Sequence, residues 1–221
     1  MEKPIFPMEY IRITQGYNEG THKDSYAIDN AGKDTTISPI YAPFTGVIKK
    51  IYQNDANEVW LESKDVVEYP DGTKDYMNIM FAHDNDVSNL FVGKVIKQKE
   101  VFYHEGTKGN ATGNHCHIEC GKGKFEDNGW HKNNAGYWSI NNAKKPEECL
   151  WIDDSIKIID SNGYDFKKIS TISVDKNNIH KEEIKKEEKQ IKNEKIFIAP
   201  KTDLYGIYLK TNQEIVIKPL S

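Results

Sequence analysis

The chain has 221 residues and a formal net charge of -4, and hydrophobic residues make up 37% of it. This length allows one sizeable domain and a smaller appendage. The charge excludes the strongly basic surface typical of nucleic-acid-binding proteins, so we expect no nucleic-acid partner.

Residues 1–150 contain short runs rich in β-branched and aromatic residues, separated by turn residues at fairly regular spacing. No long stretch shows a helical hydrophobic period. We therefore predict a mainly β fold, a compact antiparallel β-sheet domain. The predicted strands lie within residues 24–32, 39–53, 58–65, 77–84, 93–106 and 114–123.

The rest of the chain divides by composition. Residues 125–150 are loop-like and aromatic, and residues 151–175 form a β-rich extension with two strand-like runs. Residues 176–195 are mostly charged, with opposite charges four residues apart, which favours a solvated helical linker over a coiled coil. Residues 196–221 form a short β-rich segment that is too small to be stable alone. We expect this segment to pack on the main domain, pair with another copy, or join the extension in a small module.

Cysteine usage and the N-terminal sequence bear on the compartment. The three cysteines, Cys116, Cys120 and Cys149, lack CxxC spacing, which argues against a disulfide framework and a structural zinc knuckle. The N-terminal "MEKPIFPMEYIRITQGY" lacks the basic and apolar regions of a signal peptide. No apolar run reaches the roughly 20 residues that span a bilayer. We expect synthesis in a reducing compartment and no membrane partner.

The motif "GNATGNHCHIECG", residues 109–121, carries two histidines one residue apart. Alternate side chains on a strand share a face, so His115 and His117 point one way and Cys116 and Ile118 the other. Cys116 is therefore predicted to be a buried core thiol rather than a ligand or nucleophile. The histidine pair alone leaves three options: two metal ligands, one ligand with one proton-transfer group, or two ordinary polar residues.

A catalytic zinc site needs three protein ligands and an open position for water. Candidates upstream are His22 in a glycine-flanked turn, Asp29 on the strand face opposite Ile28, and His83 at the end of an apolar strand. Asp24 is a rival oxygen ligand in the polar turn. The sequence has no H-E-x-x-H helix, so a mechanism with a glutamate base has no candidate.

Four segments in order carry a family resemblance: "THKDSYAIDNAG", "IYAPFTGVIKKI", "MFAHDNDVSNLFVGKVIKQKEVF" and "GTKGNATGNHCHIE". Together they resemble the lysostaphin-type zinc endopeptidases, which cut cross-bridges and stem peptides of peptidoglycan. The resemblance covers about residues 12–121, about half of the chain. It implies that residues 1–150 form a catalytic domain with an active-site groove.

The resemblance also implies a ligand set and catalytic roles. Zinc would be held by His22, Asp29 and His117, with a fourth position open. His115 and His83 would act as general base and as stabiliser of the oxyanion, with His115 working on the water. Zinc would lower the pKa of that water to about 7. The spacing from His22 to Asp29 is longer than the family's commonest spacing, which leaves Asp24 as an alternative.

Several further residues have two interpretations. Tyr17 lies near a position where some relatives carry a tyrosine that steadies the transition state, but it could equally be a packing residue. Trp130, Tyr137 and Trp138 could wall a groove for glycan or peptide, or cap the open face of the sheet. Glu119 is structural by family precedent.

These inferences predict zinc-dependent hydrolysis of peptide bonds in bacterial peptidoglycan, at a stem or cross-bridge peptide. We expect an endolysin of a bacteriophage, made without a signal peptide in the host cytoplasm and acting on the wall after release. The C-terminal segment would recognise the wall or mediate homo-oligomerisation. The alternatives are a metal-free wall-binding or amidase-activating module on the same scaffold, and an N-acetylmuramoyl-L-alanine amidase, which would need a different ligand pattern.

Overall fold

The computed structural model describes residues 1–125 and 129–170. Its main sheet has nine strands, which are β1 (Tyr10–Gln15), β2 (Ile28–Asn30), β4 (Gly46–Tyr52), β5 (Glu58–Ser63), β8 (Met77–Ala82), β9 (Val95–Ile96), β11 (Cys116–Lys122), β14 (Ala143–Lys144) and β15 (Lys157–Asp160). Three two-stranded sheets pair β3 (Pro39–Tyr41) with β10 (Val101–His104), β6 (Val67–Glu68) with β7 (Lys74–Asp75), and β12 (Trp130–Lys132) with β13 (Trp138–Ile140). The helical elements are the 3-10 turn η1 (Gly20–His22) and the short helix α1 (Pro146–Cys149).

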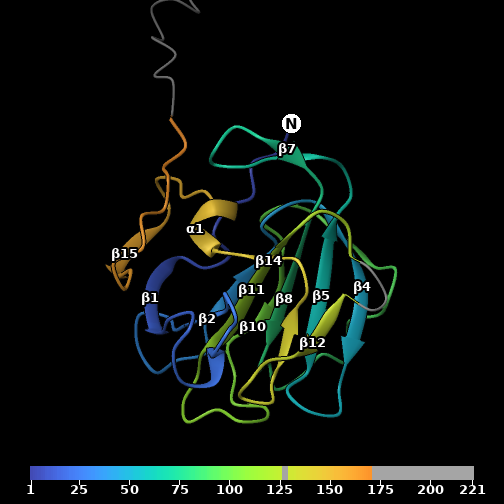
Figure 1. Cartoon of the computed structure of the whole chain (residues 1–221), viewed down its shortest axis with the longest axis vertical. Coiled ribbons are helices and arrows are strands. Elements are labelled where there is room, and N and C mark those ends of the chain that lie inside the picture. The colour runs from blue at the N-terminus through green and yellow to red at the C-terminus, as the bar shows by residue number, and fades with distance from the viewer. Residues whose placement is uncertain (126–128, 171–221) are drawn as a thin grey trace, which may run out of the picture. The chain divides into compact units, whose positions relative to one another are not determined.

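The main sheet runs from β15 at the left of Figure 1 to β4 at the right. Its strand order is β15-β1-β2-β11-β8-β5-β4-β9, and β14 pairs with β11 beside this path. The pairs from β1 to β9 are antiparallel, whereas β1 and β15 are parallel. The predicted mainly β, antiparallel fold is confirmed, with a parallel pair added at one edge.

The two central strands, β5 and β8, are buried along their whole length because both faces of the sheet are covered. Ile79 and Phe81 of β8 face the main core, which includes residues of β3 and β10. Met80, between them, faces a second cluster with Trp60 and Ile140. This alternation is the period-2 pattern of a strand with two covered faces. The β12–β13 hairpin contributes Ile140 and Trp130 to this second cluster, so it packs on the face of the sheet opposite the main core.

The prediction of loop structure for residues 125–150 was wrong in part. The described part of this segment, from residue 129 onward, contains the β12–β13 hairpin, β14 and α1. The hairpin turn is held by Asn133, whose Oδ1 accepts hydrogen bonds from the backbone N–H groups of Ala135 and Tyr137, both at 3.0 Å. Gly136 supplies a φ of 88°. The strands of the hairpin have three residues each, which is too short for a visible alternation.

Residues Met1–Ser170 form one unit, and residues Thr171–Ser221 fall in a second. The predicted linker at 176–195 and the predicted segment at 196–221 lie outside the described residues. The extension at 151–175 is described as far as residue 170, where it contributes β15. Among the residues described, no helix is long and apolar enough to cross a membrane.

Candidate metal centre and groove

Two neighbouring strands place two of the predicted ligands side by side on the sheet. His117 on β11 is the register partner of Asp29 on β2 and of Ala82 on β8. Directly opposed residues of an antiparallel pair share a face. Ile28 and Ile118, one step along each strand, are fully buried in the main core. The alternation predicted for both strands therefore holds, and it leaves Asp29 and His117 on the groove face.

His22 reaches the same point from the η1 turn. Its Nδ1 donates to the carbonyl of Gly16 at 3.0 Å, which fixes the ring and leaves Nε2 without a proton when the ring is neutral. The backbone around it is held as well, because the N–H of Ser25 donates to the His22 carbonyl at 2.9 Å. His22 is only 2% exposed, so its position is set by the fold rather than by solvent.

The facing atoms of the three residues form a nearly equilateral triangle. His22 Nε2 lies 3.2 Å from Asp29 Oδ1, His117 Nδ1 lies 3.1 Å from the same oxygen, and the two nitrogens are 3.1 Å apart. A tetrahedral zinc ion with bond lengths of about 2.0–2.1 Å separates its ligand atoms by about 3.3 Å. The triangle therefore has the edge length of one face of a zinc tetrahedron.

The donor chemistry of the triangle also fits a cation. Burial opposes ionisation of Asp29, but hydrogen bonds from the protonated forms of His117 and His22 outweigh it and hold the pKa of the carboxyl well below its usual range. A carboxylate and the bare Nε2 of His22 both direct lone pairs at the same point. Such an arrangement calls for a cation or a shared proton between them. Two imidazoles and one carboxylate are a typical ligand set for a catalytic zinc ion.

His83 and His115 lie beside this triangle. His115 Nε2 is 3.6 Å from Asp29 Oδ2, and the rings of His83 and His115 have centroids 4.5 Å apart. The Nδ1 of His115 donates to the Gly113 carbonyl at 2.8 Å, and that of His83 donates to the Lys108 carbonyl at 2.7 Å. When neutral, each ring can therefore accept a proton only at Nε2.

Burial and charge keep His83 neutral. Desolvation, together with repulsion from His117 and His115, lowers the pKa of His83 to about 4. His83 also has a φ of 89°, an unusual backbone conformation for a residue with a side chain. Gly106 allows this packing, because a Cβ there would lie 2.1 Å from the His83 carbonyl oxygen. The same glycine exchanges backbone hydrogen bonds with His115, so it brings the two histidines together.

Two residues considered at the sequence level lie elsewhere. Cys116 is fully buried in the main core, as its place in the alternation predicted. Asp24 is exposed and is hydrogen-bonded by the amide of Asn134. Among the described residues it belongs neither to the triangle nor to the second group of potential ligands, which is Asp29, His83 and His115.

Tyr17 also lies outside the histidine cluster. Its hydroxyl donates to Glu147 Oε1 at 3.0 Å, and its ring stacks on Tyr164 at a centroid distance of 4.4 Å. Burial and the Glu147 carboxylate raise the pKa of the Tyr17 phenol well above its usual range. These two contacts hold the Tyr17 side chain against Glu147 and Tyr164.

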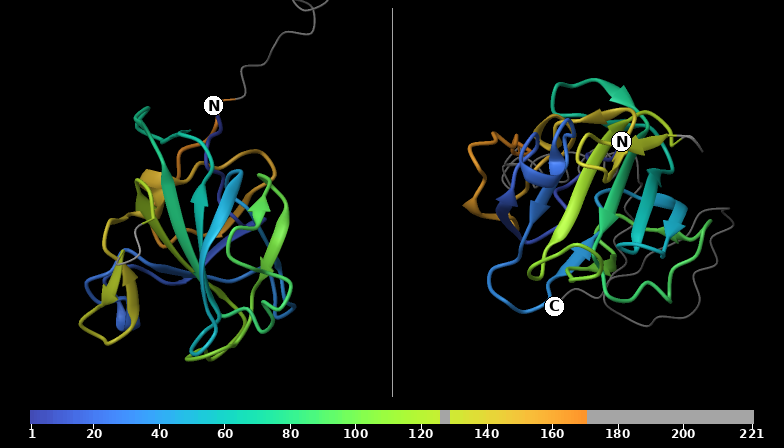
Figure 2. Two further views of the ribbon diagram at one scale, coloured as in Figure 1. Left: turned by 90° about the vertical axis from the view of Figure 1, so that its right-hand side faces the viewer. Right: turned by 60° about the horizontal axis from the view of Figure 1, so that its bottom comes forward.

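A groove opens over the triangle, with the β12–β13 hairpin as one wall. In the left view of Figure 2 the yellow hairpin lies beside the blue η1 turn, and Asn133 Nδ2 donates to the Thr21 carbonyl at 2.9 Å. Tyr137 and Trp138 line the groove, and the Tyr137 hydroxyl accepts a hydrogen bond from Asn110 Nδ2 at 2.7 Å.

The three aromatic residues of the hairpin therefore differ in position. Trp130 packs against Trp60 and Phe125, so it covers the sheet. Tyr137 and Trp138 belong to the wall of the groove. Both interpretations of this aromatic segment apply, each to different residues.

Glu119 on β11 binds two other segments by hydrogen bonds. One is the metal loop, which we define as residues 20–25 around His22, and the other is the β12–β13 hairpin. Glu119 lies two residues from His117 on the same face and is fully buried. Its Oε1 accepts hydrogen bonds from Ser25 Oγ at 2.7 Å and Ser139 Oγ at 2.6 Å, and its Oε2 accepts one from the Ile140 N–H at 2.6 Å. Sequence reasoning gave Glu119 a structural role but could not identify these partners, because they are far apart in the chain.

No protein-family model matches the chain. The chain is 32% identical over 203 residues to Morphogenesis protein 1 of Bacillus phage B103, and the match covers 85% of this chain and 51% of that protein. The chain thus spans about half the length of this relative.

Two solved structures are similar to the chain at low identity. The catalytic domain of the antimicrobial peptidase lysostaphin from Staphylococcus simulans is 19% identical, with 61% of this chain and 86% of that one covered at a TM-score of 0.40. A zinc-containing peptidase from Vibrio cholerae is also 19% identical, with 52% and 36% covered at a TM-score of 0.39. Similarity at this level leaves the activity to be argued from the site itself.

Proposed function

We propose that this protein is a zinc-dependent peptidase that hydrolyses peptide bonds of bacterial peptidoglycan. The observation that carries the proposal is the triangle of His22, Asp29 and His117, whose edges of 3.1–3.2 Å match a tetrahedral zinc site. The three residues would hold zinc on one side and leave its remaining position open toward the groove. When bound, zinc supplies Lewis-acid activation of water and of a substrate carbonyl.

Two histidines beside the triangle are proposed to handle protons. In both His115 and His83, Nδ1 donates a hydrogen bond to a backbone carbonyl. The Nε2 of each neutral ring is therefore available as a proton acceptor. We assign the general base to His115, because its Nε2 lies nearest to the Asp29 carboxylate and the protonated ring would be stabilised there. His83, from the neighbouring strand, would stabilise charge that develops on the substrate oxygen.

The substrate class is proposed from the groove and from the sequence resemblance together. Tyr137 and Trp138 offer aromatic surface along the wall, which suits an extended peptide or an attached glycan. Among possible peptide substrates, the sequence resemblance to peptidoglycan endopeptidases favours the peptides of the bacterial cell wall. Tyr17 would take no part in the chemistry, since its hydroxyl is bound to Glu147.

Mass spectrometry of muropeptides tests this proposal directly. Purified walls treated with the zinc-loaded protein are expected to release fragments with new amine termini, and their masses identify the bond that is cut. The His117→Ala variant is expected to bind no zinc and release none. If the wild-type protein binds zinc but releases no new amines, the domain is a binding module rather than a peptidase.

The biological setting is a separate proposal. The sequence similarity to a phage protein supports a phage setting. In that setting a wall-cleaving enzyme would act as an endolysin after release from the host cytoplasm. That relative is named for morphogenesis, so lysis needs its own test. Deletion of the encoding gene is expected to leave particle assembly intact and delay host lysis. Loss of assembled particles would contradict the endolysin role.

A further inference from the structure

Glu58 is a buried carboxylate in the groove that lacks a cationic partner. It is 4% exposed and lines the groove together with His22, Asp29 and His117. Its Oε2 accepts a hydrogen bond from the Ala56 N–H at 3.2 Å. The ion pairs of the described residues do not include Glu58. A buried carboxylate without a counter-charge is costly, so Glu58 either takes up a proton or pairs with a cation that enters the groove.

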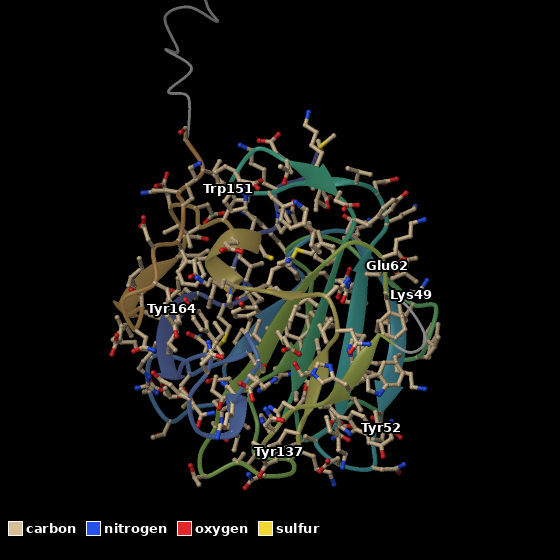
Figure 3. The ribbon with its side chains drawn as sticks, in the orientation of Figure 1. Lys49, Tyr52, Glu62, Tyr137, Trp151 and Tyr164 are labelled. Atoms are coloured by element: carbon tan, nitrogen blue, oxygen red, sulfur yellow. The ribbon has the colours of Figure 1, made fainter. Side chains whose placement is uncertain are left out.

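Glu62 on the same strand provides a contrast. It is four residues from Glu58 and therefore on the same face of β5. Its carboxylate pairs with Lys49 at 3.4 Å and also accepts a hydrogen bond from the Phe125 N–H. Figure 3 shows Glu62 and Lys49 next to each other on β5 and β4. The fold thus neutralises one of the two buried glutamates and leaves the other open to the groove.

The register of the sheet places Glu58 relative to the metal triangle. Val59 pairs with Phe81, so Glu58 faces Ala82, which in turn pairs with His117. Glu58 and His117 are therefore two strands apart in one row, a distance of about 10 Å at the usual strand spacing. Ala82 between them has only a methyl side chain, which leaves the groove open along this row.

Two aromatic residues lie on the same side of the sheet as Glu58. Tyr52 on β4 is the direct register partner of Glu58, so the two side chains share a face. The ring of Tyr52 meets that of Trp138 edge-on at a centroid distance of 6.4 Å, and Trp138 lines the groove. The Lys132 ammonium already lies over the Trp138 ring, 5.2 Å from its centroid. An ammonium group of a ligand would therefore be bound chiefly by the charge of Glu58, with the Tyr52 ring adding cation–π attraction.

Among the described residues, the rest of the groove lining offers Glu58 no cationic lysine or arginine partner. The groove-lining residues include Asp55 and Glu58 but no lysine or arginine. Burial raises the pKa of Glu58, and the nearby Asp55 adds to this effect, while hydrogen bonds from its own N–H and that of Ala56 oppose it. A cation that enters the groove would therefore relieve an unfavourable charge. A carboxyl group on the substrate would be repelled from the same place.

We infer that Glu58, on the same side of the sheet as Tyr52 and Trp138, binds an organic ammonium group of the peptide substrate about 10 Å from the metal triangle. This inference rests on the proposed function for the identity of the substrate. A lysine-type side chain one to two residues from the cleaved bond would span that distance. Glu58 would make the enzyme specific for peptides with a free amine on one side of the cut.

A binding experiment tests the inference without relying on hydrolysis. The probe is the peptide Ala–Lys–Ala with blocked ends, with its ε-amine either free or acetylated, titrated into the full chain by calorimetry. Wild type and the matched control Glu62→Gln are expected to bind the free-amine form about tenfold or more tightly, as for one charged hydrogen bond. Glu58→Gln is expected to bind both forms equally. Its unfolding midpoint should stay near that of wild type, since glutamine retains the acceptor for Ala56.

Equal binding of both peptides by wild type, or absence of binding, would overturn the inference. So would a preference for the free amine that persists in Glu58→Gln. A second arm then uses purified walls before and after acetylation of their free amines. Slower cleavage of acetylated walls by wild type but not by Glu58→Gln supports the role in specificity. If the peptides discriminate but no wall is cleaved, the proposed function fails while the ammonium site stands.

Discussion

Glu119 offers the sharpest test of how the fold builds the site. Replacement by alanine removes the acceptor of three hydrogen bonds and leaves the hydroxyls of Ser25 and Ser139 and the N–H of Ile140 buried without it. A buried donor left unsatisfied costs about 1–3 kcal/mol, and the residues can partly relax. We expect Glu119→Ala to lower the free energy of unfolding by about 3–5 kcal/mol.

Glutamine provides the matched control. In Glu119→Gln the amide oxygen can accept from the Ile140 N–H, and the amide N–H groups can donate to the two serine hydroxyls, which accept as well as donate. We expect this variant to lose only about 1 kcal/mol, because the network is rebuilt with reversed hydroxyls. Urea denaturation monitored by tryptophan fluorescence measures both values.

The same pair of variants links stability to the metal loop. The Ser25 N–H donates to the His22 carbonyl, so loss of the bond from Ser25 to Glu119 loosens the turn that carries His22. Zinc affinity, measured by competition with a chromophoric chelator, is expected to fall about 10-fold or more in the alanine variant and less in the glutamine variant. If Glu119→Ala costs less than about 1 kcal/mol, or if both variants bind zinc like wild type, this reasoning is refuted.

Three further predictions follow from the histidines and Tyr17. His115→Ala is expected to keep zinc but to lose wall hydrolysis by about 100-fold or more, and full activity with bound zinc would remove it as general base. Because the pKa of His83 is lowered to about 4, the unfolded chain binds a proton below about pH 6.5 that the folded chain does not. The free energy of unfolding of the metal-free protein should therefore fall by roughly 3 kcal/mol between pH 6.5 and pH 4, and less so in His83→Asn; equal slopes in the two proteins would contradict this. Tyr17→Phe should lower stability by about 1–2 kcal/mol through loss of the bond to Glu147 and change kcat less than twofold, whereas a much larger fall in kcat would restore a catalytic role.

The parts of the site that follow from local alternation could be predicted from the sequence. The period of two in "HCHIE" places His117 opposite Cys116, and the same rule separates Asp29 from Ile28. The structure has both pairs divided in this way, with Cys116 and Ile28 in the core. Strand spacing and side-chain direction are properties of a short segment, so a single sequence contains them.

Features that depend on register between distant strands could not be predicted. The neighbours of Glu58 are known only once β5 is aligned with β4 and β8. The same holds for Tyr17, whose partner Glu147 is 130 residues away, and for the three donors that meet at Glu119. The parallel pairing of β15 with β1 also had no local signal, because either strand direction gives the same pattern of exposed residues.

X-ray absorption spectroscopy of the zinc-loaded protein tests the central claim most directly. We expect one zinc ion per chain, bound by nitrogen and oxygen atoms at about 2.0–2.1 Å, with scattering from two imidazole rings and none from sulfur. The His117→Ala variant should lose this spectrum, and a variant of the buried Cys116 should retain it. A sulfur shell at about 2.3 Å, or the same spectrum in His117→Ala, would contradict a centre built from His22, Asp29 and His117.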